Sequence, residues 1–247
     1  MSLIPGLGVV VLAGGLGRRL QGQDKGLVTL GGIPMAAHVL QAMVPVSERI
    51  VINANRNHER YFDLVRDMSE SHDGLSTHLA TPPVVADTMP DYPGPLAGLL
   101  TGLRTLDTDF VFMCPCDSPF IGPELPKRLL ASLESVEADV AVPFDGTREQ
   151  PIFLLVRRAC LASLEAFLAA GERKIDLWYQ GEEKVAVPAA DLCRMFVNIN
   201  TEDDRGAAEA WLRTGGVREV FEADETWEAG EARAAGEVRA RGDTRKS

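Results

Sequence analysis

The sequence lacks the features that would place a protein in a membrane or on nucleic acid. None of its apolar runs approaches the roughly eighteen residues of a membrane span, and residues 1–5 have no basic start of a signal peptide. A basic stripe is also missing, and the formal net charge is -11. We therefore expect a cytoplasmic protein with no membrane partner and no nucleic-acid partner.

The sequence is also poor in cysteine and histidine, with four of each among 247 residues. Cys114 and Cys116 are the one close pair of cysteines, and no second pair follows at zinc-ligand spacing. The four histidines lack the spacing of a metal cluster or a catalytic triad. This pattern argues against a zinc site, and we interpret the cysteines as reduced core thiols.

The sequence does contain 45% hydrophobic residues, in apolar runs that alternate with helical patterns. We expect buried strands at 8–13, 49–53, 84–86, 110–114, 139–143 and 152–156. We expect helices at 34–44, 95–106, 123–133 and 158–170. The alternation predicts a three-layer α/β/α domain over residues 1–214 with a mostly parallel sheet, and ligands in such folds bind at the carboxyl ends of the strands.

Two segments do not follow the alternation. Residues 60–82 are polar and irregular, so we expect a mobile excursion between a helix and a strand. Residues 215–247 are rich in Glu, Ala, Arg and Gly and have almost no apolar anchors. Such a composition cannot bury a core, which predicts a charged, disordered C-terminal tail.

A glycine-rich loop follows the first strand and is the most informative local feature. Residues 12–27 combine small residues with two arginines and a lysine. Small residues let backbone N–H groups approach phosphate oxygens, and the cations offset the phosphate charge. The loop is not a dinucleotide fingerprint, because Leu20 stands at the third glycine position, and it is not a Walker A loop, because Gln23 replaces the lysine. A surface turn with solvated charges is the alternative interpretation.

Asp117 is the second candidate functional residue. It follows the apolar run 110–114 and lies between Pro115 and Pro119, which stiffen the backbone. A carboxylate at the carboxyl end of a strand can bind a hard cation, and Mg²⁺ could bridge it to substrate phosphates. An Asx-turn, or a cap for the helix that begins near Pro123, is the open alternative.

Amide and carboxylate side chains stand at three further strand ends. Asn53 offers both a donor and an acceptor, which suits a base edge, although Asn is also common in turns. Asp87 could act likewise or cap the turn that follows it. Asn198 and Asn200 would share one face of an extended segment, while Asn200 or Thr201 could instead cap the last helix.

Together these segments resemble the molybdenum cofactor guanylyltransferase (MobA) family. The resemblance runs in order from about residue 9 to residue 211. The loop alone indicates the wider nucleotidyltransferase family, whereas two further motifs make the match more specific. These motifs are Asp-Tyr-Pro-Gly-Pro-Leu-Ala-Gly at 91–98 and Cys-Pro-Cys-Asp at 114–117.

The resemblance implies a Rossmann-like nucleotidyltransferase domain. It implies transfer of GMP from GTP to the terminal phosphate of the molybdenum-molybdopterin cofactor, with release of pyrophosphate. Molybdoenzymes or their chaperones would then receive the product. Carried over by motif, the residues that would bind GTP are Leu12, Ala13, Gly14, Lys25, Asn53, Asp87 and Asp117.

The resemblance also implies that Asp117 holds Mg²⁺ and that two further residues, Asn198 and Asn200, line the pterin side. From the chemistry of the loop, we expect Lys25 and the loop N–H groups to hold the β- and γ-phosphates, with Arg19 nearby. One alternative is a molybdenum cofactor cytidylyltransferase or another nucleotidyltransferase. A more distant alternative is a non-catalytic protein that binds a nucleotide or the cofactor.

Overall fold

The computed structural model describes residues 3–13, 23–70, 82–87 and 94–213. The chain divides into two compact units, Met1–Arg205 and Gly206–Ser247, and the sheet belongs to the first unit. The predicted domain boundary at 214/215 stays a prediction, as does the disorder of the tail, because residues 214–247 lie outside the described residues.

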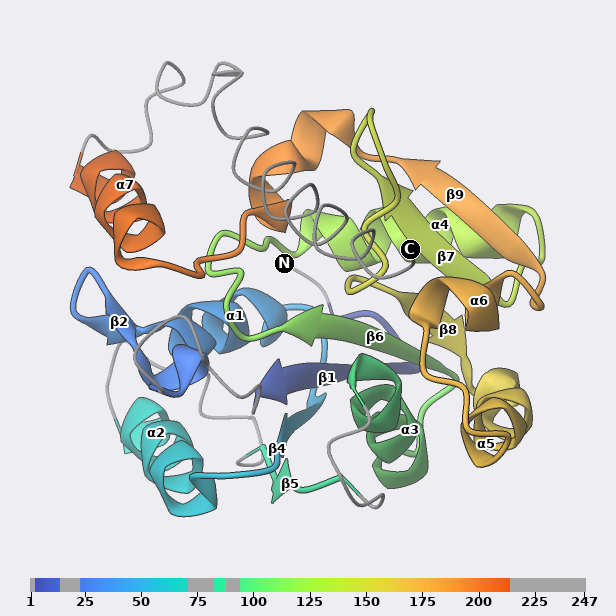
Figure 1. The fold of residues 1–247 in the computed structure, drawn as a ribbon, viewed down its shortest axis with the longest axis horizontal. Helices are drawn as coiled ribbons and strands as arrows, with labels where there is room; N and C mark the ends of the chain where they lie inside the picture. The colour runs from blue at the N-terminus through green and yellow to red at the C-terminus, as the bar shows by residue number, and fades with distance from the viewer. Residues whose placement is uncertain (1–2, 14–22, 71–81, 88–93, 214–247) are drawn as a thin grey trace, which may run out of the picture. The chain divides into compact units, whose positions relative to one another are not determined.

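A seven-stranded sheet forms the centre of the described part of the first unit (Figure 1). Its strand order is β5-β4-β1-β6-β8-β7-β9, with β8 antiparallel to both neighbours and the other pairs parallel. The strands are β1 Leu7–Ala13, β4 Arg49–Ala54, β5 Val84–Val85, β6 Phe110–Pro115, β7 Val140–Phe144, β8 Leu155–Arg157 and β9 Lys184–Pro188. The predicted mostly parallel sheet is therefore confirmed. A small antiparallel pair, β2 Thr29–Leu30 and β3 Ile33–Pro34, stands apart from it.

Helices cover both faces of the sheet, which confirms the predicted three layers. Buried residues of α1, α2 and α4 join one hydrophobic cluster, and those of α3, α5 and α6 join the other. Val9 and Val11 of β1 belong to the first cluster and Val10 to the second, as expected of alternating side chains in a strand. The helices are α1 Met35–Met43, α2 His58–Glu70, α3 Pro95–Thr105, α4 Glu124–Ser135, α5 Leu161–Ala169 and α6 Ile175–Tyr179. Short 3₁₀ segments lie at Lys25–Leu27, Arg158–Cys160 and Ala190–Phe196. The helix α7, Glu202–Arg213, includes the position at which the two units divide.

The prediction for residues 60–82 was wrong over its first part, which belongs to α2. Tyr61, Val65 and Met68 are buried at helical spacing, whereas most of the helix is polar. A narrow apolar stripe is enough to dock a helix on a sheet, but it is easily overlooked in a polar segment. Residues 71–81 lie outside the described residues.

The predicted strand at 152–156 was wrong in its start, and neither the small β2–β3 pair nor strand β9 of the main sheet was predicted. The backbone N–H of Phe153 donates to the carbonyl of Gln150 (3.0 Å), closing a turn where the strand was expected to begin. The strand β8 therefore begins at Leu155. The edge strand β9 was missed although it contains the apolar run Val185-Ala186-Val187, because a run of three residues is short for a strand; only Val187 is buried.

Candidate active site

The candidate site lies where three strands end side by side. Leu12 of β1 stands in register with Asn53 of β4 and with Pro115 of β6. The chain passes from β1 to β4 on one side and returns to β6 on the other, so the strand order reverses at β1 (Figure 1). Open α/β sheets bind ligands at such a switch point, beyond the carboxyl ends of the strands.

Lys25, Asp117 and Asn200 come together at the β6 side of this point. The Lys25 ammonium donates to Asp117 Oδ2 at 2.9 Å and also to Asn200 Oδ1. The backbone N–H of Ile199 donates to the Asp117 carbonyl at 2.9 Å, which holds the two segments together. The Lys25 and Asp117 side chains are 23% and 13% exposed, so the pair is sheltered but open to a ligand.

The segment around Asn198 is held on the same turn. The Ser118 hydroxyl, which is buried, donates to Asn198 Oδ1. Ser118 was not predicted, although its position directly after Asp117 was a usable signal. Asn198 and Asn200 therefore both face the 117–118 turn.

The choice of cap for α7 is settled by a reciprocal pair of contacts. The Asp204 backbone N–H donates to Thr201 Oγ1 at 3.1 Å, and Asp204 Oδ2 accepts from the backbone N–H groups of Asn200 and Thr201, each at 2.8 Å. This is the arrangement of a capping box. Thr201 is the cap, and the Asn200 side chain is left for Lys25.

Asn53 and Asp87 form a second cluster at the ends of β4 and β5. Asn53 Nδ2 donates to Asp87 Oδ1 at 2.9 Å, and Asn55 Nδ2 donates to Asp87 Oδ2 at 2.8 Å. The Asp87 backbone N–H donates in return to Asn55 Oδ1 at 2.8 Å. Asn55 was not predicted as a site residue; it follows the end of β4, two residues after Asn53. The cluster joins the two strand ends into one surface.

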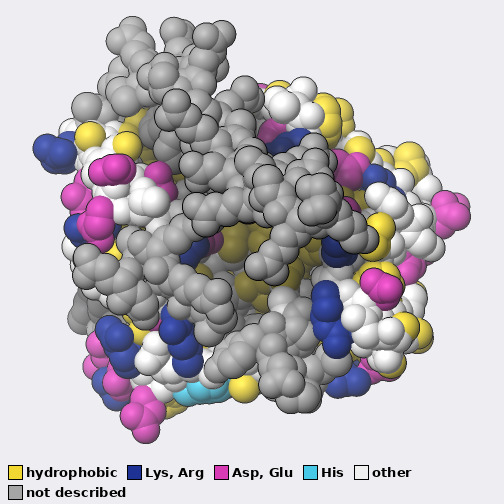
Figure 2. Space-filling view, in the orientation of Figure 1, with side chains coloured by type: hydrophobic (Ala, Val, Ile, Leu, Met, Phe, Trp, Pro, Cys, Tyr) yellow, Lys and Arg dark blue, Asp and Glu magenta, His cyan; other side chains and the backbone are white. Residues whose placement is uncertain are grey.

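Of the four remaining predicted residues, the structure describes two. Leu12 and Ala13 end β1 between the two clusters, and Ala13 is buried. Gly14 and Arg19 lie outside the described residues. On the face seen in Figure 2, several Lys and Arg side chains are visible to either side of an apolar area near the centre. Cationic side chains gathered locally can attract an anionic ligand even on an acidic protein.

Gly98 of α3 provides a test of how tightly this surface is packed. A Cβ at Gly98 would overlap the Leu12 side chain and lie 2.5 Å from Asn53 Oδ1. We expect Gly98→Ala to lower the free energy of unfolding by about 1–3 kcal/mol, because crowding in a packed interior forces neighbours to move. Chemical denaturation would measure this.

The matched control is Gly206→Ala in α7, where an added Cβ meets no described atom within 4 Å. Alanine there should keep or raise stability by up to about 1 kcal/mol, since it favours helix over glycine. Equal effects of the two substitutions would contradict the close packing at Gly98.

The oxygen donors at Asp117 fit one kind of metal site. Among the described residues, no group of three or more His, Cys, Asp or Glu side chains is placed to hold an ion. A cage built from protein ligands alone is therefore not formed there. Mg²⁺ usually binds one or two carboxylates together with substrate phosphates and water. The Asp117 carboxylate, with the Asn200 amide oxygen nearby, fits that pattern.

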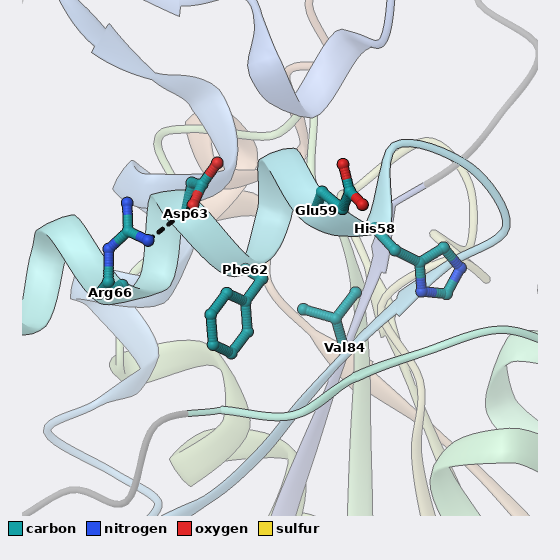
Figure 3. A pocket seen from close by; sticks show the side chains of 6 residues that line it. All are labelled: His58, Glu59, Phe62, Asp63, Arg66 and Val84. Atoms are coloured by element: carbon teal, nitrogen blue, oxygen red, sulfur yellow. Dashed lines mark ion pairs between the residues drawn. The ribbon is translucent and has the colours of Figure 1, made fainter.

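A separate hollow of about 470 Å³ lies on the outer side of α2 and contains none of the predicted site residues. Figure 3 shows Phe62 and Val84 near its middle and the paired Asp63 and Arg66 to one side. His58 and Glu59 complete its lining. None of its lining residues belongs to the two clusters described above, and we assign it no role.

The fold and the site define an α/β domain of the nucleotidyltransferase class. A family model described as the MobA-like NTP transferase domain matches residues 9–185. The chain belongs to this family. Among the described residues, no helix combines the length and the apolar character that crossing a bilayer requires.

Two curated relatives cover most of the chain. The molybdenum cofactor guanylyltransferase of Shewanella frigidimarina is 42% identical over 204 residues, which is 82% of this chain and 95% of that protein. That of Shewanella loihica is 40% identical over 201 residues, or 81% and 94%. Among solved structures, molybdopterin-guanine dinucleotide biosynthesis protein A from Archaeoglobus fulgidus has a TM-score of 0.67 and 24% identity, over 83% of this chain and 98% of that one. That structure supports the fold.

Proposed function

We propose that this chain is a molybdenum cofactor guanylyltransferase. It transfers GMP from GTP to the terminal phosphate of the molybdenum-molybdopterin cofactor and releases pyrophosphate. The observation that carries this proposal is the Lys25–Asp117 pair at the switch point of the sheet. It occurs in a chain about 40% identical to molybdenum cofactor guanylyltransferases over four-fifths of its length.

Transfer of GMP to a phosphate requires positioning and charge stabilisation rather than a nucleophilic side chain. Both reactants are anions, and the attacking phosphate oxygen is already ionised, so a protein base has little to do. The barrier lies in bringing two phosphates together and stabilising the charge on the leaving pyrophosphate. Lys25, placed 2.9 Å from Asp117, would contribute its charge to the β- and γ-phosphates. Arg19 and the backbone at Gly14 would act on the same phosphates.

Asp117 and its neighbours would hold the reacting end of the substrates. Mg²⁺ bound to Asp117 and to phosphate oxygens would neutralise charge at the reaction centre. Asp117 is well suited because its own backbone is tied to Ile199 and its carboxylate is only 13% exposed. Asn198 and Asn200, on the same turn, would line the side that receives the pterin.

The base of the nucleotide would occupy the opposite half of the strand-end surface. Asn53 is 5% exposed and is oriented by Asp87. Buried, oriented amides discriminate well between bases, because a wrong base leaves polar groups unpaired. Leu12 and Ala13 lie between the two halves, next to Asn53 and the 115–117 segment.

The decisive experiment measures pyrophosphate release with GTP, CTP and ATP, each with molybdenum-molybdopterin and Mg²⁺. We expect turnover with GTP and formation of the guanine dinucleotide cofactor, identified by mass spectrometry. Turnover with CTP but not GTP would make the protein a cytidylyltransferase. Tight GTP binding without turnover on any acceptor would make it a non-catalytic nucleotide-binding protein.

A further inference from the structure

Asp24 is a buried carboxylate directly before Lys25, with a side chain only 1% exposed. Tyr61 donates its hydroxyl to Asp24 Oδ1 at 2.6 Å, and Asn57 Nδ2 donates to Asp24 Oδ2 at 3.0 Å. Arg56 Nε lies 3.7 Å from the same Oδ2. Buried carboxylates are costly unless they are paired and hydrogen-bonded, so a site this fully partnered holds its geometry firmly.

The carboxylate of Asp24 does not cap its own 3₁₀ turn. Its backbone is extended and precedes Lys25–Leu27, and its side chain makes no capping hydrogen bond. All three of its partners instead come from the turn after β4 and the start of α2. The contacts therefore tie the end of the glycine-rich loop to a different part of the sheet.

Gly26, which directly follows Lys25, is closely packed as well. A Cβ at Gly26 would collide with the Tyr61 hydroxyl and lie 3.0 Å from Cys116 Sγ. Lys25 thus stands between two anchored neighbours. Burial raises the pKa of Tyr61 far above its usual range, which keeps this phenol protonated as a donor.

The turn after β4 also supports the half of the site proposed to bind the base. Asn53 and Asn55 hold Asp87, while Arg56 and Asn57 hold Asp24. Asn57 has a left-handed backbone with φ of 56°, a conformation that Asn adopts more readily than most other residues. One short segment therefore carries both halves of the surface.

We propose that Asp24 is a positioning residue for Lys25. It anchors the backbone at Lys25 so that the ammonium reaches Asp117 and Asn200, and it takes no part in contacting the substrate. The inference rests on the proposed function only in naming phosphate as the group that Lys25 meets. Asp24→Asn tests it. The substitution replaces one accepting carboxylate oxygen with an NH₂ group, and this donor would then face the hydroxyl of Tyr61 or the amide of Asn57, which are donors too. Tyr61→Phe, which removes one hydroxyl and keeps the ring, tests it where the first variant fails to fold.

The first measurement needs no substrate. An amine-reactive reagent labels the ligand-free protein, and mass spectrometry gives the labelling rate of each lysine. We expect Asp24→Asn or Tyr61→Phe to raise the rate at Lys25 by about threefold, because its partly exposed ion pair is weakened. Lys184, which pairs with Glu149 and is 26% exposed, is the internal control and should not change.

The second measurement is a double-mutant cycle on GTP affinity. Asp24→Asn alone should weaken GTP binding by about tenfold, because a misplaced cation loses its phosphate contact. In a Lys25→Ala background the same substitution should weaken GTP binding by less than about twofold, because the effects of two residues that act through one another are not additive. Asp63→Asn, an exposed carboxylate on α2, should leave binding unchanged.

The outcomes separate this inference from the proposed function. Unchanged labelling of Lys25, or equal losses of GTP affinity with and without Lys25, would overturn the positioning role and leave Asp24 as a stabilising residue. A wild-type protein that binds no GTP would refute the proposed function, while the labelling rates would still decide the role of Asp24.

Discussion

Asp117→Ala should lower turnover by about 100-fold or more while the protein remains folded. Among the described residues, the Asp117 carboxylate is the acidic group that forms an ion pair with Lys25, just after the end of β6. Its loss removes the proposed ligand for Mg²⁺, and Lys25 keeps a partner in Asn200. Steady-state pyrophosphate release and the Mg²⁺ concentration giving half-maximal activity would be measured together. We expect both a lower rate and a higher Mg²⁺ concentration for half-maximal activity.

The matched control for Asp117 is Asp191→Ala. Asp191 also pairs with a cation, Arg128, but its side chain is 63% exposed. An exposed pair of this kind adds little to stability, so turnover should stay near the wild-type value. Wild-type turnover in Asp117→Ala would refute the metal assignment. A loss of rate without a change in the Mg²⁺ requirement would assign Asp117 to holding Lys25 instead.

Lys25→Ala should also lower turnover by about 100-fold or more, because a preorganised charge near the leaving pyrophosphate is lost. The important observation is how the loss divides between kcat and KM for GTP. An interaction that strengthens in the transition state lowers kcat, whereas one that is equal in the ground state raises KM only. We expect kcat to fall. A rise in KM with unchanged kcat would restrict Lys25 to GTP binding.

Lys184→Ala is the matched control for Lys25. Its ammonium pairs with Glu149, and at 26% its side-chain exposure is close to the 23% of Lys25. Both kinetic constants should stay near the wild-type values. Thermal unfolding of each variant would separate a loss of chemistry from a loss of fold.

Most of the fold could be predicted because buried parallel strands are apolar along their length. The runs at 8–13, 49–53 and 110–114 became β1, β4 and β6, the strands that carry the site. The segments missed have weak or short apolar patterns. In β9 the apolar run is only three residues long, and in α2 the buried stripe is narrow among polar residues.

The candidate site was predictable to the extent that its residues end strands. Lys25, Asn53, Asp87 and Asp117 are each signalled by a preceding apolar run or by the loop that follows one. Asp24 and Ser118 were not singled out, because their importance comes from partners. The hydroxyl that holds Asp24 belongs to Tyr61, 37 positions along the chain, and the amide beside Ser118 is 80 positions away. Local patterns carry no information about such pairs.

By itself, the sequence determined the class of fold, the loop of small and cationic residues, and the polar groups that follow the strands, since each depends on neighbours along the chain. Only the tertiary structure decided that Lys25 meets Asp117 and Asn200, 92 and 175 positions away. The physical reason is the order of the strands. Putting β1 between β4 and β6 brings these distant ends together, and the order results from packing the whole sheet between its helices.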